Sequence, residues 1–454
     1  MKVVLKTITP LFIGKGQEEN IITYNWWVDK NGREAWLLKI DLLHIFLKHR
    51  LKDKEVRRII MKKIKDQNNN QALKIFNLKD ILENLEKENL IKVKEEIKKN
   101  TVKFKTGKNL DVYGRKEGYE TRNLRNFINF EKNNQFFYYI PGSSLKGALR
   151  TYILFWLLDK LNNKFGNAFG YLANPTLESI LRNKRKQKKQ IQLKDIINSL
   201  RKVTKNGRDV YWINLLEFTK ELLEIFFDGK RKGKIEIGKF NIIIDFQSLI
   251  RDNTLNLYSQ IEQVLKHNKK LQSYQRKFLE QLLEKDIDAL EKFLINYRDF
   301  FGLFKATNFV LSDSNFLDLK DFAIVETKRK KGGRVKSGIP ILMLALNEEK
   351  EASFSLEIKN KNKEKLFLET LKKATKEIND MIFRKYRKVG VNNRLIEKLE
   401  SINNQKNNFL INLGAFSGAS LKSFLALYMN NYPSTYNMTK DNKVLGWVTL
   451  AFDL

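Results

Sequence analysis

Residues 139–151, which read YIPGSSLKGALRT, constrain the fold more than any other part of this 454-residue chain. The apolar and aromatic run at 135–140 is typical of a β-strand, and Pro141 fixes φ and disfavours helix before it. Gly142 permits an unusual turn, and the apolar residues after it recur at helical spacing. The sequence therefore predicts a strand that turns directly into a helix, which ends near residues 162–163.

The predicted helix has two distinct faces. Leu145, Leu149 and Tyr152 stand at i, i+4 and i+7 and form an apolar stripe that we expect to be buried. Lys146 and Arg150, also four residues apart, share a different face. The start of a helix offers free N–H groups and the positive end of its dipole, so this junction with its two cations suits a phosphate group.

Small residues at the start of this helix support the same interpretation. Ser143 or Ser144 can cap the helix by accepting a hydrogen bond from a backbone N–H. Gly147 stands where a helix prefers alanine, which suggests that an RNA backbone or a neighbouring element approaches closely. The alternative is an ordinary capped amphipathic helix on a basic protein.

A second glycine-rich segment, LGAFSGASLKS at 413–423, lies near the C-terminus. It does not match a nucleotide-binding P-loop, because Ala419 stands five places after Gly414 where that motif has a second glycine. What remains is a glycine-bearing turn after a strand, with Ser420 and Lys422 at the start of the next helix. This geometry favours phosphate binding without nucleotide hydrolysis.

The charge of the chain indicates a polyanionic partner. The sequence has 86 lysines and arginines against 52 aspartates and glutamates, a net charge of +34. Hydrophobic residues make up 42% of it, so the charge accompanies a globular composition. Biased codon usage would explain lysine in place of arginine, but not this surplus of cations. We therefore expect nucleic acid, and RNA in particular, with the basic run at 182–190 either in contact with it or forming a solvated helix face.

Residue types that carry catalysis or bind metals are scarce. The chain has no cysteine and three histidines, and His44 and His49 are five residues apart, a poor spacing for one metal ion. The third histidine is His267. Asp111 and Asp313 lie in or beside polar segments, where isolated aspartates are usually turn formers. The sequence therefore predicts no catalytic residue, no metal site and no cofactor.

The sequence also predicts where the protein acts. No stretch is long and apolar enough to span a membrane, and the N-terminal segment alternates apolar and polar residues, unlike a signal peptide. We therefore expect a cytoplasmic protein without membrane partners.

Aromatic residues cluster at 26–27, 136–139, 226–227 and 300–301. Base stacking is one role for such rings in an RNA-binding protein. Adjacent aromatics on a strand send one ring inward and one outward, however, so most of these rings are expected to fill the core.

The predicted elements indicate an α+β fold. Strands are expected at 3–13, 21–28, 35–40, 135–140, 235–246, 309–312, 322–327, 339–346, 352–358, 409–413 and 444–452. Besides the helix after Pro141, helices are expected at 41–52, 53–100, 176–203, 255–304, 364–387 and 420–429, and polar loops at 101–120 and 328–336. This pattern fits an α+β core with large insertions better than a parallel βαβ sheet.

Several short motifs occur together in a characteristic order. They are a strand ending TPLFIGKG, then YIPGSSLKGALR, the strand NFVLSDSNF, the glycine-rich LGAFSGASLKS and a closing LGWV. In this order the chain resembles the RAMP superfamily of CRISPR effector subunits, and within it most resembles the fifth subunit of the type III-A Csm complex.

The resemblance implies a core of RRM-like (ferredoxin-like) α+β units with helical insertions. The implied division is an N-terminal RRM-like domain at 1–175 with an insertion near 53–120, a mainly helical insertion at 176–305, and a C-terminal RRM-like portion at 306–454. The implied role is non-catalytic. Such a subunit caps the 3′-end side of the guide RNA (crRNA) and supports its maturation and the assembly of an antiviral ribonucleoprotein. The implied partners are crRNA, the adjacent RAMP backbone and small subunits, target RNA, and recruited cellular nucleases that trim the RNA.

Carried over to this sequence, the resemblance implies RNA-binding residues in three segments. They are Gly14, Lys15, Gly16, Gly142, Ser143, Ser144, Lys146, Gly147, Arg150, Gly414, Gly418, Ser420 and Lys422. The late loop departs from the family's pattern, because Ala415 and Ala419 replace glycines there.

Two other functions remain open at this point. One is a metal-independent RAMP endoribonuclease that processes CRISPR repeat RNA, which needs an acid and a base around a 2′-hydroxyl and has three histidines to draw on. The other is a RAMP backbone subunit that repeats along the guide.

Overall fold

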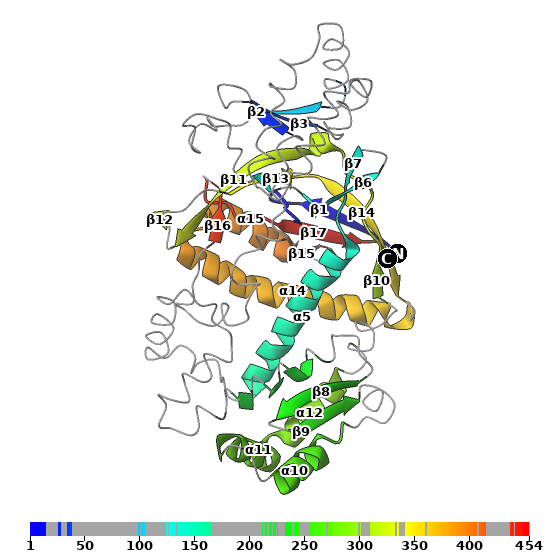
Figure 1. Ribbon diagram of the computed structural model, residues 1–454, viewed down its shortest axis with the longest axis vertical. Helices are drawn as coiled ribbons and strands as arrows, with labels where there is room; N and C mark the ends of the chain where they lie inside the picture. The colour runs from blue at the N-terminus through cyan, green and yellow to red at the C-terminus, as the bar shows by residue number, and fades with distance from the viewer. Residues whose placement is uncertain are drawn as a thin grey trace, which may run out of the picture.

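The computed structural model in Figure 1 describes about half of the chain in detail. These residues are 1–14, 26–28, 34–38, 99, 101–105, 124–125, 127–132, 135–164, 211, 214–215, 218–219, 221–223, 225, 232–237, 240–245, 255–268, 271, 273–297, 300, 309–331, 334–335, 341–358, 361–405, 408–414, 436–439 and 441–453. The structural findings apply to these residues.

A five-stranded antiparallel sheet lies at the centre of the molecule (Figure 1). Its strands, in spatial order, are β10 (Phe309–Leu311), β14 (Glu351–Ile358), β1 (Lys2–Thr7), β17 (Trp447–Phe452) and β15 (Phe409–Asn412). Alternate residues of β1 and β14 are buried, as expected for strands with one face on a core. A strand from the beginning of the chain therefore lies between two strands from its end.

A second sheet lies beside the first and has the order β12-β11-β13-β5, with β16 also paired to β11. Its strands are β5 (Leu124–Arg125), β11 (Phe322–Lys331), β12 (Arg334–Val335), β13 (Ile341–Leu346) and β16 (Tyr436–Met438). The polar loop expected at 328–336 is wrong in part, because the backbone of Lys328–Lys331 continues β11 and pairs with β12 and β16. Four consecutive cations, Lys328–Lys331, do not prevent this pairing, because backbone groups and not side chains form the ladder.

Three of the described helices pack on the central sheet. They are α5 (Gly142–Lys164), α14 (Lys361–Val389) and α15 (Asn393–Asn403). Figure 1 shows α5 crossing α14, and α14 contacts α5, α15 and β15. The predicted end of α5 is confirmed. The predicted stripe is confirmed as well, because Leu145, Leu149 and Tyr152 are all buried.

A buried polar network fixes α5 against the other helices and the sheet. The Tyr152 hydroxyl donates to Asn379 Oδ1 at 2.8 Å and accepts from the Asn412 N–H at 3.0 Å. Asn379 Nδ2 in turn donates to Asn403 Oδ1 at 2.9 Å and to the Leu410 carbonyl at 2.7 Å. Burial raises the pKa of the Tyr152 phenol above its usual value. One hydroxyl therefore connects α5 with α14 and β15, and through Asn379 with α15.

A hairpin and a short sheet accompany these layers. The hairpin of β6 (Asn129–Lys132) and β7 (Gln135–Tyr138) leads into α5. The antiparallel sheet β2-β3-β4 consists of Trp26–Val28, Glu34–Leu38 and Thr101–Lys105. The loop expected at 101–120 is therefore wrong over Thr101–Lys105, whose alternation of Val102 and Phe104 is typical of a strand.

A separate cluster of elements lies at the far end of α5 (Figure 1). It contains the hairpin of β8 (Lys232–Ile237) and β9 (Phe240–Asp245) with α10 (Leu257–His267), α11 (Ser273–Lys285) and α12 (Ile287–Asn296). The expected β-rich and helical character of this part is confirmed. The short 3₁₀ helix η5 (Leu319–Asp321) precedes β11.

The α+β class expected from the sequence is confirmed. The helices expected at 41–52, 176–203 and 420–429 lie outside the described residues, as does nearly all of 53–100. The proposed domain boundaries stay a prediction, although β1 shares its sheet with β14 and β17. None of the described helices is long and apolar enough to cross a membrane.

The Tyr152 hydroxyl provides a first test. Tyr152→Phe should lower the free energy of unfolding by about 1–3 kcal/mol, because it leaves the buried Asn412 N–H without an acceptor. Urea denaturation measures this change. The matched control is Tyr258→Phe on α10. Tyr258 is 49% exposed, so this variant should lose almost none of its free energy of unfolding. Equal stability of the two variants would contradict the structural role of the network.

Candidate nucleic-acid interface

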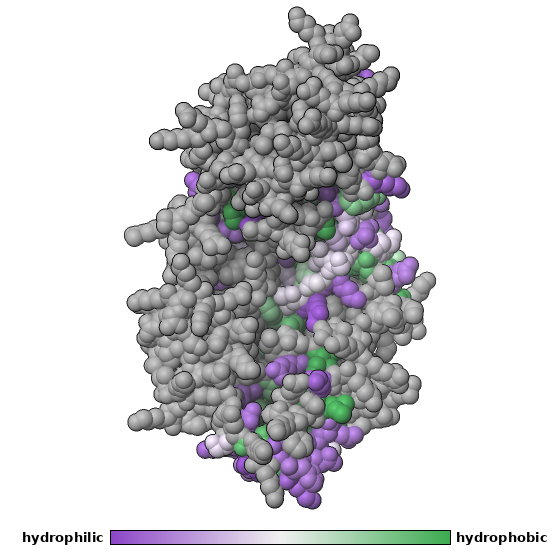
Figure 2. All heavy atoms as spheres, viewed as in Figure 1, coloured by the Kyte–Doolittle hydropathy of each residue, from purple (hydrophilic) through white to green (hydrophobic). Residues whose placement is uncertain are grey.

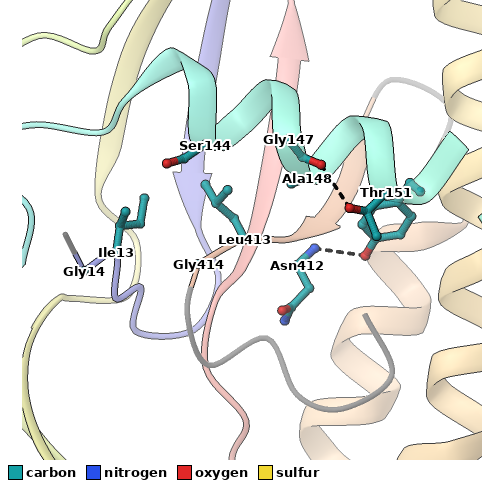
Figure 3. Close-up of a pocket in the computed structure, with 10 residues that line it drawn as sticks. Ile13, Gly14, Ser144, Gly147, Ala148, Thr151, Asn412, Leu413 and Gly414 are labelled. Carbon is teal, nitrogen blue, oxygen red and sulfur yellow. Dashed lines mark hydrogen bonds between the residues drawn. The ribbon is translucent and has the colours of Figure 1, made fainter. Parts of the chain in front are cut away.

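Three segments that are far apart in the sequence meet around one cavity of about 310 Å³, which we call the glycine groove. Figure 3 shows α5 along one side and residues 13–14 and 412–414 along the other. The described residues that line it are Ile13, Gly14, Ser144, Gly147, Ala148, Thr151, Tyr152, Asn412, Leu413 and Gly414. The structure thus brings together the N-terminal, helix-start and C-terminal motifs that the sequence singled out.

The start of α5 is held by the segment that follows β10. The Gly142 N–H donates to Asp313 Oδ1 at 2.9 Å, so this amide is already paired. A Cβ at Gly142 would lie 2.1 Å from the Leu311 carbonyl oxygen, so only glycine allows this close packing. Ser143 and Ser144 lie inside the first turn, and the expected serine cap is wrong because Asp313 supplies the cap instead. The sequence interpreted Asp313 as a turn former and missed this contact across the fold.

The residue before Pro141 is fixed in the same way. The Ile140 N–H donates to the Ser314 hydroxyl at 2.6 Å, and the Ser314 N–H donates to the Ile140 carbonyl at 3.1 Å. The adjacent Asp313 and Ser314 therefore position the strand-to-helix junction as a rigid unit.

Gly147 faces open space at the groove. No described atom lies within 4 Å of the position that its Cβ would take. The Thr151 hydroxyl donates to the Gly147 carbonyl at 3.0 Å, which leaves the hydroxyl satisfied within the helix (Figure 3). The sequence allowed two neighbours for Gly147, an RNA backbone or another element of the protein. No protein element among the described residues occupies this place.

Lys146 is a cation without a described carboxylate partner. Burial lowers the pKa of its ammonium group, and the positive charge of Arg150 lowers it further. The two cations thus lie on one face of α5, as predicted from their spacing. An anion near Lys146 would relieve this repulsion and stabilise the charged form.

The N-terminal side of the groove is formed by residues 13–14. The Ile128 N–H donates to the Ile13 carbonyl at 2.7 Å and so anchors this segment beside β6. A Cβ at Gly14 would lie 3.2 Å from the Phe12 ring, which leaves little room for a side chain. Lys15 and Gly16 lie outside the described residues.

Two glycines with positive φ position the C-terminal side. Gly414 has a φ of +98°, and its Cβ would lie 2.3 Å from the Phe12 carbonyl oxygen. Gly446 has a φ of +86°, and its Cβ would lie 2.2 Å from the Leu413 carbonyl oxygen. The predicted turn after the strand is therefore present at Gly414. Gly418, Ser420, Lys422 and the two alanines of the same loop lie outside the described residues.

The floor of the groove is neutral and polar. Asn412 Nδ2 donates to the Leu445 carbonyl at 3.0 Å, while Asn412 Oδ1 is buried without a hydrogen-bond partner. The Tyr152 hydroxyl is engaged in the buried network, and its raised pKa keeps it protonated. The described lining contains no carboxylate, histidine or lysine. Such a groove offers hydrogen bonds and close backbone approach, whereas Lys146 and Arg150 of α5 do not belong to its lining.

Sequence comparison identifies the family. A family model of the RAMP superfamily matches residues 4–419. The chain belongs to the RAMP superfamily. The resemblance that the ordered motifs predicted is thus confirmed, and no curated protein matches the chain.

Two solved structures resemble this RAMP protein over nearly its whole length. One is a chain in the cryo-EM structure of a Csm-crRNA-target RNA ternary complex of a type III-A CRISPR-Cas system. It shares 16% identity and a TM-score of 0.51, with 99% of this chain and 100% of that chain covered. The other is the crystal structure of T. onnurineus Csm5, with 14% identity, a TM-score of 0.41, and 98% and 99% of the two chains covered. The first likeness shows a shared fold.

Of the residues that sequence analysis considered for catalysis, the described His267 and Asp313 do not line the groove. His267 is the exposed last residue of α10, in the cluster at the far end of α5, and His44 and His49 lie outside the described residues. Among the described side chains, no group of three or more histidine, aspartate or glutamate residues could hold a metal ion.

A substitution at Gly147 of this RAMP protein tests, through the free energy of unfolding, whether the space beside Gly147 is open. Gly147→Ala should raise the free energy of unfolding by about 0.5–1 kcal/mol, because alanine has the higher helix propensity and its methyl group meets no described atom. Urea denaturation measures the change. Gly142→Ala is the matched control and should destabilise the protein, since its methyl group would overlap the Leu311 carbonyl. A loss of stability in Gly147→Ala would show that the groove is filled by protein.

Proposed function

We propose that this chain is a non-catalytic RNA-binding subunit of a cytoplasmic type III-A Csm complex and corresponds to its fifth subunit. In this role it caps the 3′-end side of the crRNA and supports maturation of the RNA and assembly of the complex in antiviral defence. The observation that carries the proposal is the meeting of three glycine-bearing segments at one groove, on a helix that also carries two neighbouring cations. Membership of the RAMP superfamily and the fold shared with a chain of a Csm-crRNA-target RNA complex support it.

The groove suits a ribose-phosphate backbone for physical reasons. Ser144, Asn412 and the glycine backbones supply neutral polar groups, and Gly147 leaves room for close approach. Lys146 supplies a charge that gains from an anionic partner. Contacts of this kind hold the backbone and carry little sequence information. We therefore propose Gly14, Ser143, Ser144, Lys146, Gly147, Arg150 and Gly414 as RNA-binding residues, with Lys15, Gly16, Gly418, Ser420 and Lys422 as further candidates. We leave out Gly142, whose amide is taken by Asp313.

The lining of the groove favours binding over catalysis. Cleavage at a 2′-hydroxyl needs a base and an acid within hydrogen-bond reach of the reacting atoms. The described lining offers neither, because its one phenol, Tyr152, stays protonated and is buried in the network.

The proposal implies a set of partners and a division of the fold. The partners are crRNA, the adjacent RAMP backbone and small subunits of the Csm complex, target RNA, and cellular nucleases that trim the crRNA. We retain RRM-like units with helical insertions as the interpretation of the core, with the boundaries given from the sequence.

Lys146 tests RNA binding directly. Lys146→Ala should weaken binding of single-stranded RNA and reduce the slope of log affinity against log salt by about 0.7, the value for one phosphate contact. Fluorescence anisotropy over a salt series measures both quantities. Lys266→Ala, an exposed lysine on α10, is the matched control. Unchanged affinity and slope in Lys146→Ala would refute the contact.

The pH dependence of binding offers a second test. The pKa of Lys146 lies below its usual 10.5 in the free protein, and a bound phosphate would raise it. Affinity for RNA should therefore fall as the pH rises through the lowered pKa, because the deprotonated amine no longer attracts phosphate. Lys146→Arg stays charged and should lack this part of the decline. If the wild type and Lys146→Arg show the same pH profile, Lys146 does not bind phosphate.

Two experiments separate the alternatives. Specific cleavage of CRISPR repeat RNA in the presence of a chelator, lost in His44→Ala or His267→Ala, would show an endoribonuclease. Native mass spectrometry of the affinity-purified assembly distinguishes a cap, present once per guide, from a backbone subunit, present in several copies.

A further inference from the structure

An exposed group of rings lies beside the start of α5, and we call it the aromatic cluster. Its members are Phe130, Phe137, Tyr139 and Phe316. Phe130 and Phe137 are a cross-strand pair of the β6–β7 hairpin, stacked with ring centroids 5.4 Å apart and planes at 20°. Phe316 packs on both rings, at 5.4 Å and 5.1 Å, and Tyr139 meets Phe130 edge-on at 5.7 Å.

The cluster lies on the outer face of the hairpin. Tyr138, the residue between Phe137 and Tyr139, points to the core, is 3% exposed and packs on Phe322. Phe316, by contrast, is 62% exposed. The sequence expected most rings of its aromatic clusters to fill the core, and the structure divides the cluster at 136–139 between the two faces. A phenylalanine that stays largely in water on top of other rings offers one free aromatic surface.

The cluster is joined rigidly to the glycine groove. Tyr138 and Leu317 form a β-bridge, in which the Leu317 N–H donates to the Tyr138 carbonyl at 2.8 Å. The Ser314 and Asp313 bonds to Ile140 and Gly142 continue this connection into α5. Tyr139 and the groove residue Ser144 are separated by less than about 18 Å of backbone. A short single strand that lies in the groove therefore reaches the cluster.

The surroundings of Phe316 are polar. Asn315, Ser312, Ser143 and Lys132 are all exposed, and Asp313 is exposed but bonded to the Gly142 amide. Figure 2 shows the same mixture, with hydrophobic and hydrophilic atoms side by side along the described surface over this hairpin and the start of α5. An apolar protein surface would leave these polar groups without partners. A nucleobase has an apolar face with polar edges, and it fits one aromatic surface within a polar rim.

We propose that the aromatic cluster is a stacking platform for one unpaired base of the RNA strand whose backbone occupies the glycine groove. This inference rests on the proposed function and adds to it a second kind of contact, independent of charge. Phe316 supplies the stacking surface, and Phe130 and Phe137 hold its ring in place from below. Stacking of this kind tolerates any base, which suits a protein that binds guides of different sequence.

Phe316 variants of the full-length chain test this inference. Phe316→Ala should weaken binding of single-stranded RNA by about fivefold or more without changing the salt slope, because stacking releases no counterions. Phe316→Tyr keeps the ring and should bind normally. Tyr258→Ala, which removes an exposed ring on α10, is the matched control and should have no effect. RNA with 2-aminopurine moved along the strand should show fluorescence quenching at one position, and Phe316→Ala should abolish it.

The possible results are distinguishable. If the wild-type protein binds no RNA, the proposed function fails and the inference fails with it. If Lys146→Ala weakens binding while Phe316→Ala does not, and no position of 2-aminopurine is quenched, the function stands and the stacking platform is refuted. If Phe316→Ala keeps its RNA affinity but loses co-purification with other Csm subunits, the cluster is a protein contact. That result also overturns the inference.

An RNA made abasic at the quenched position should bind the wild type and Phe316→Ala equally well.

Discussion

Close approach of one backbone to another is the constraint on which the rest of this structure depends. Gly142, Gly414 and Gly446 each lie where a Cβ would stand between 2.1 and 2.3 Å from a carbonyl oxygen of another segment. The Gly142 contact joins the start of α5 to the end of β10, and the Gly414 and Gly446 contacts join the end of β15 to Phe12 and to the segment before β17. The hydroxyl of Tyr152 then links α5 to α14 and β15. The glycine groove lies where three chain segments, residues 13–14, α5 and residues 412–414, meet.

This arrangement changes how an anion would be held. A free helix start would offer its amides to a phosphate, but Asp313 occupies the Gly142 amide, and the Pro141 carbonyl accepts from Ser144 at 3.0 Å. The remaining attraction comes from neutral polar groups in the lining and from Lys146 and Arg150, which lie elsewhere on α5. Binding is therefore expected to depend on salt and to be tolerant of sequence. An exposed aromatic surface beside the groove adds a contact that salt does not weaken.

Local patterns in the sequence predicted the strand-to-helix junction, the apolar stripe of α5 and the turn at Gly414, since proline, glycine and helical spacing act over a few residues. They did not predict contacts made across the fold. The Asp313 cap joins residues that are 171 positions apart, and nothing near Asp313 in sequence indicates it. The same limit applies to the exposure of Phe316, because its packing is decided by Phe130 and Phe137 of the β6–β7 hairpin, which are distant in the sequence. The strand at Thr101–Lys105 had a local signal, the alternation of Val102 and Phe104, that its polar surroundings obscured.

The most direct test of the account is to locate RNA on the assembled protein. Ultraviolet crosslinking of the intact complex, followed by mass spectrometry of the peptides, identifies which residues touch nucleotides. We expect crosslinked peptides from residues 127–150 and 309–320, together with the segment that begins at Leu413. Crosslinks confined to α10, α11 and α12, with none at these segments, would contradict the central claim that the glycine groove holds an RNA strand.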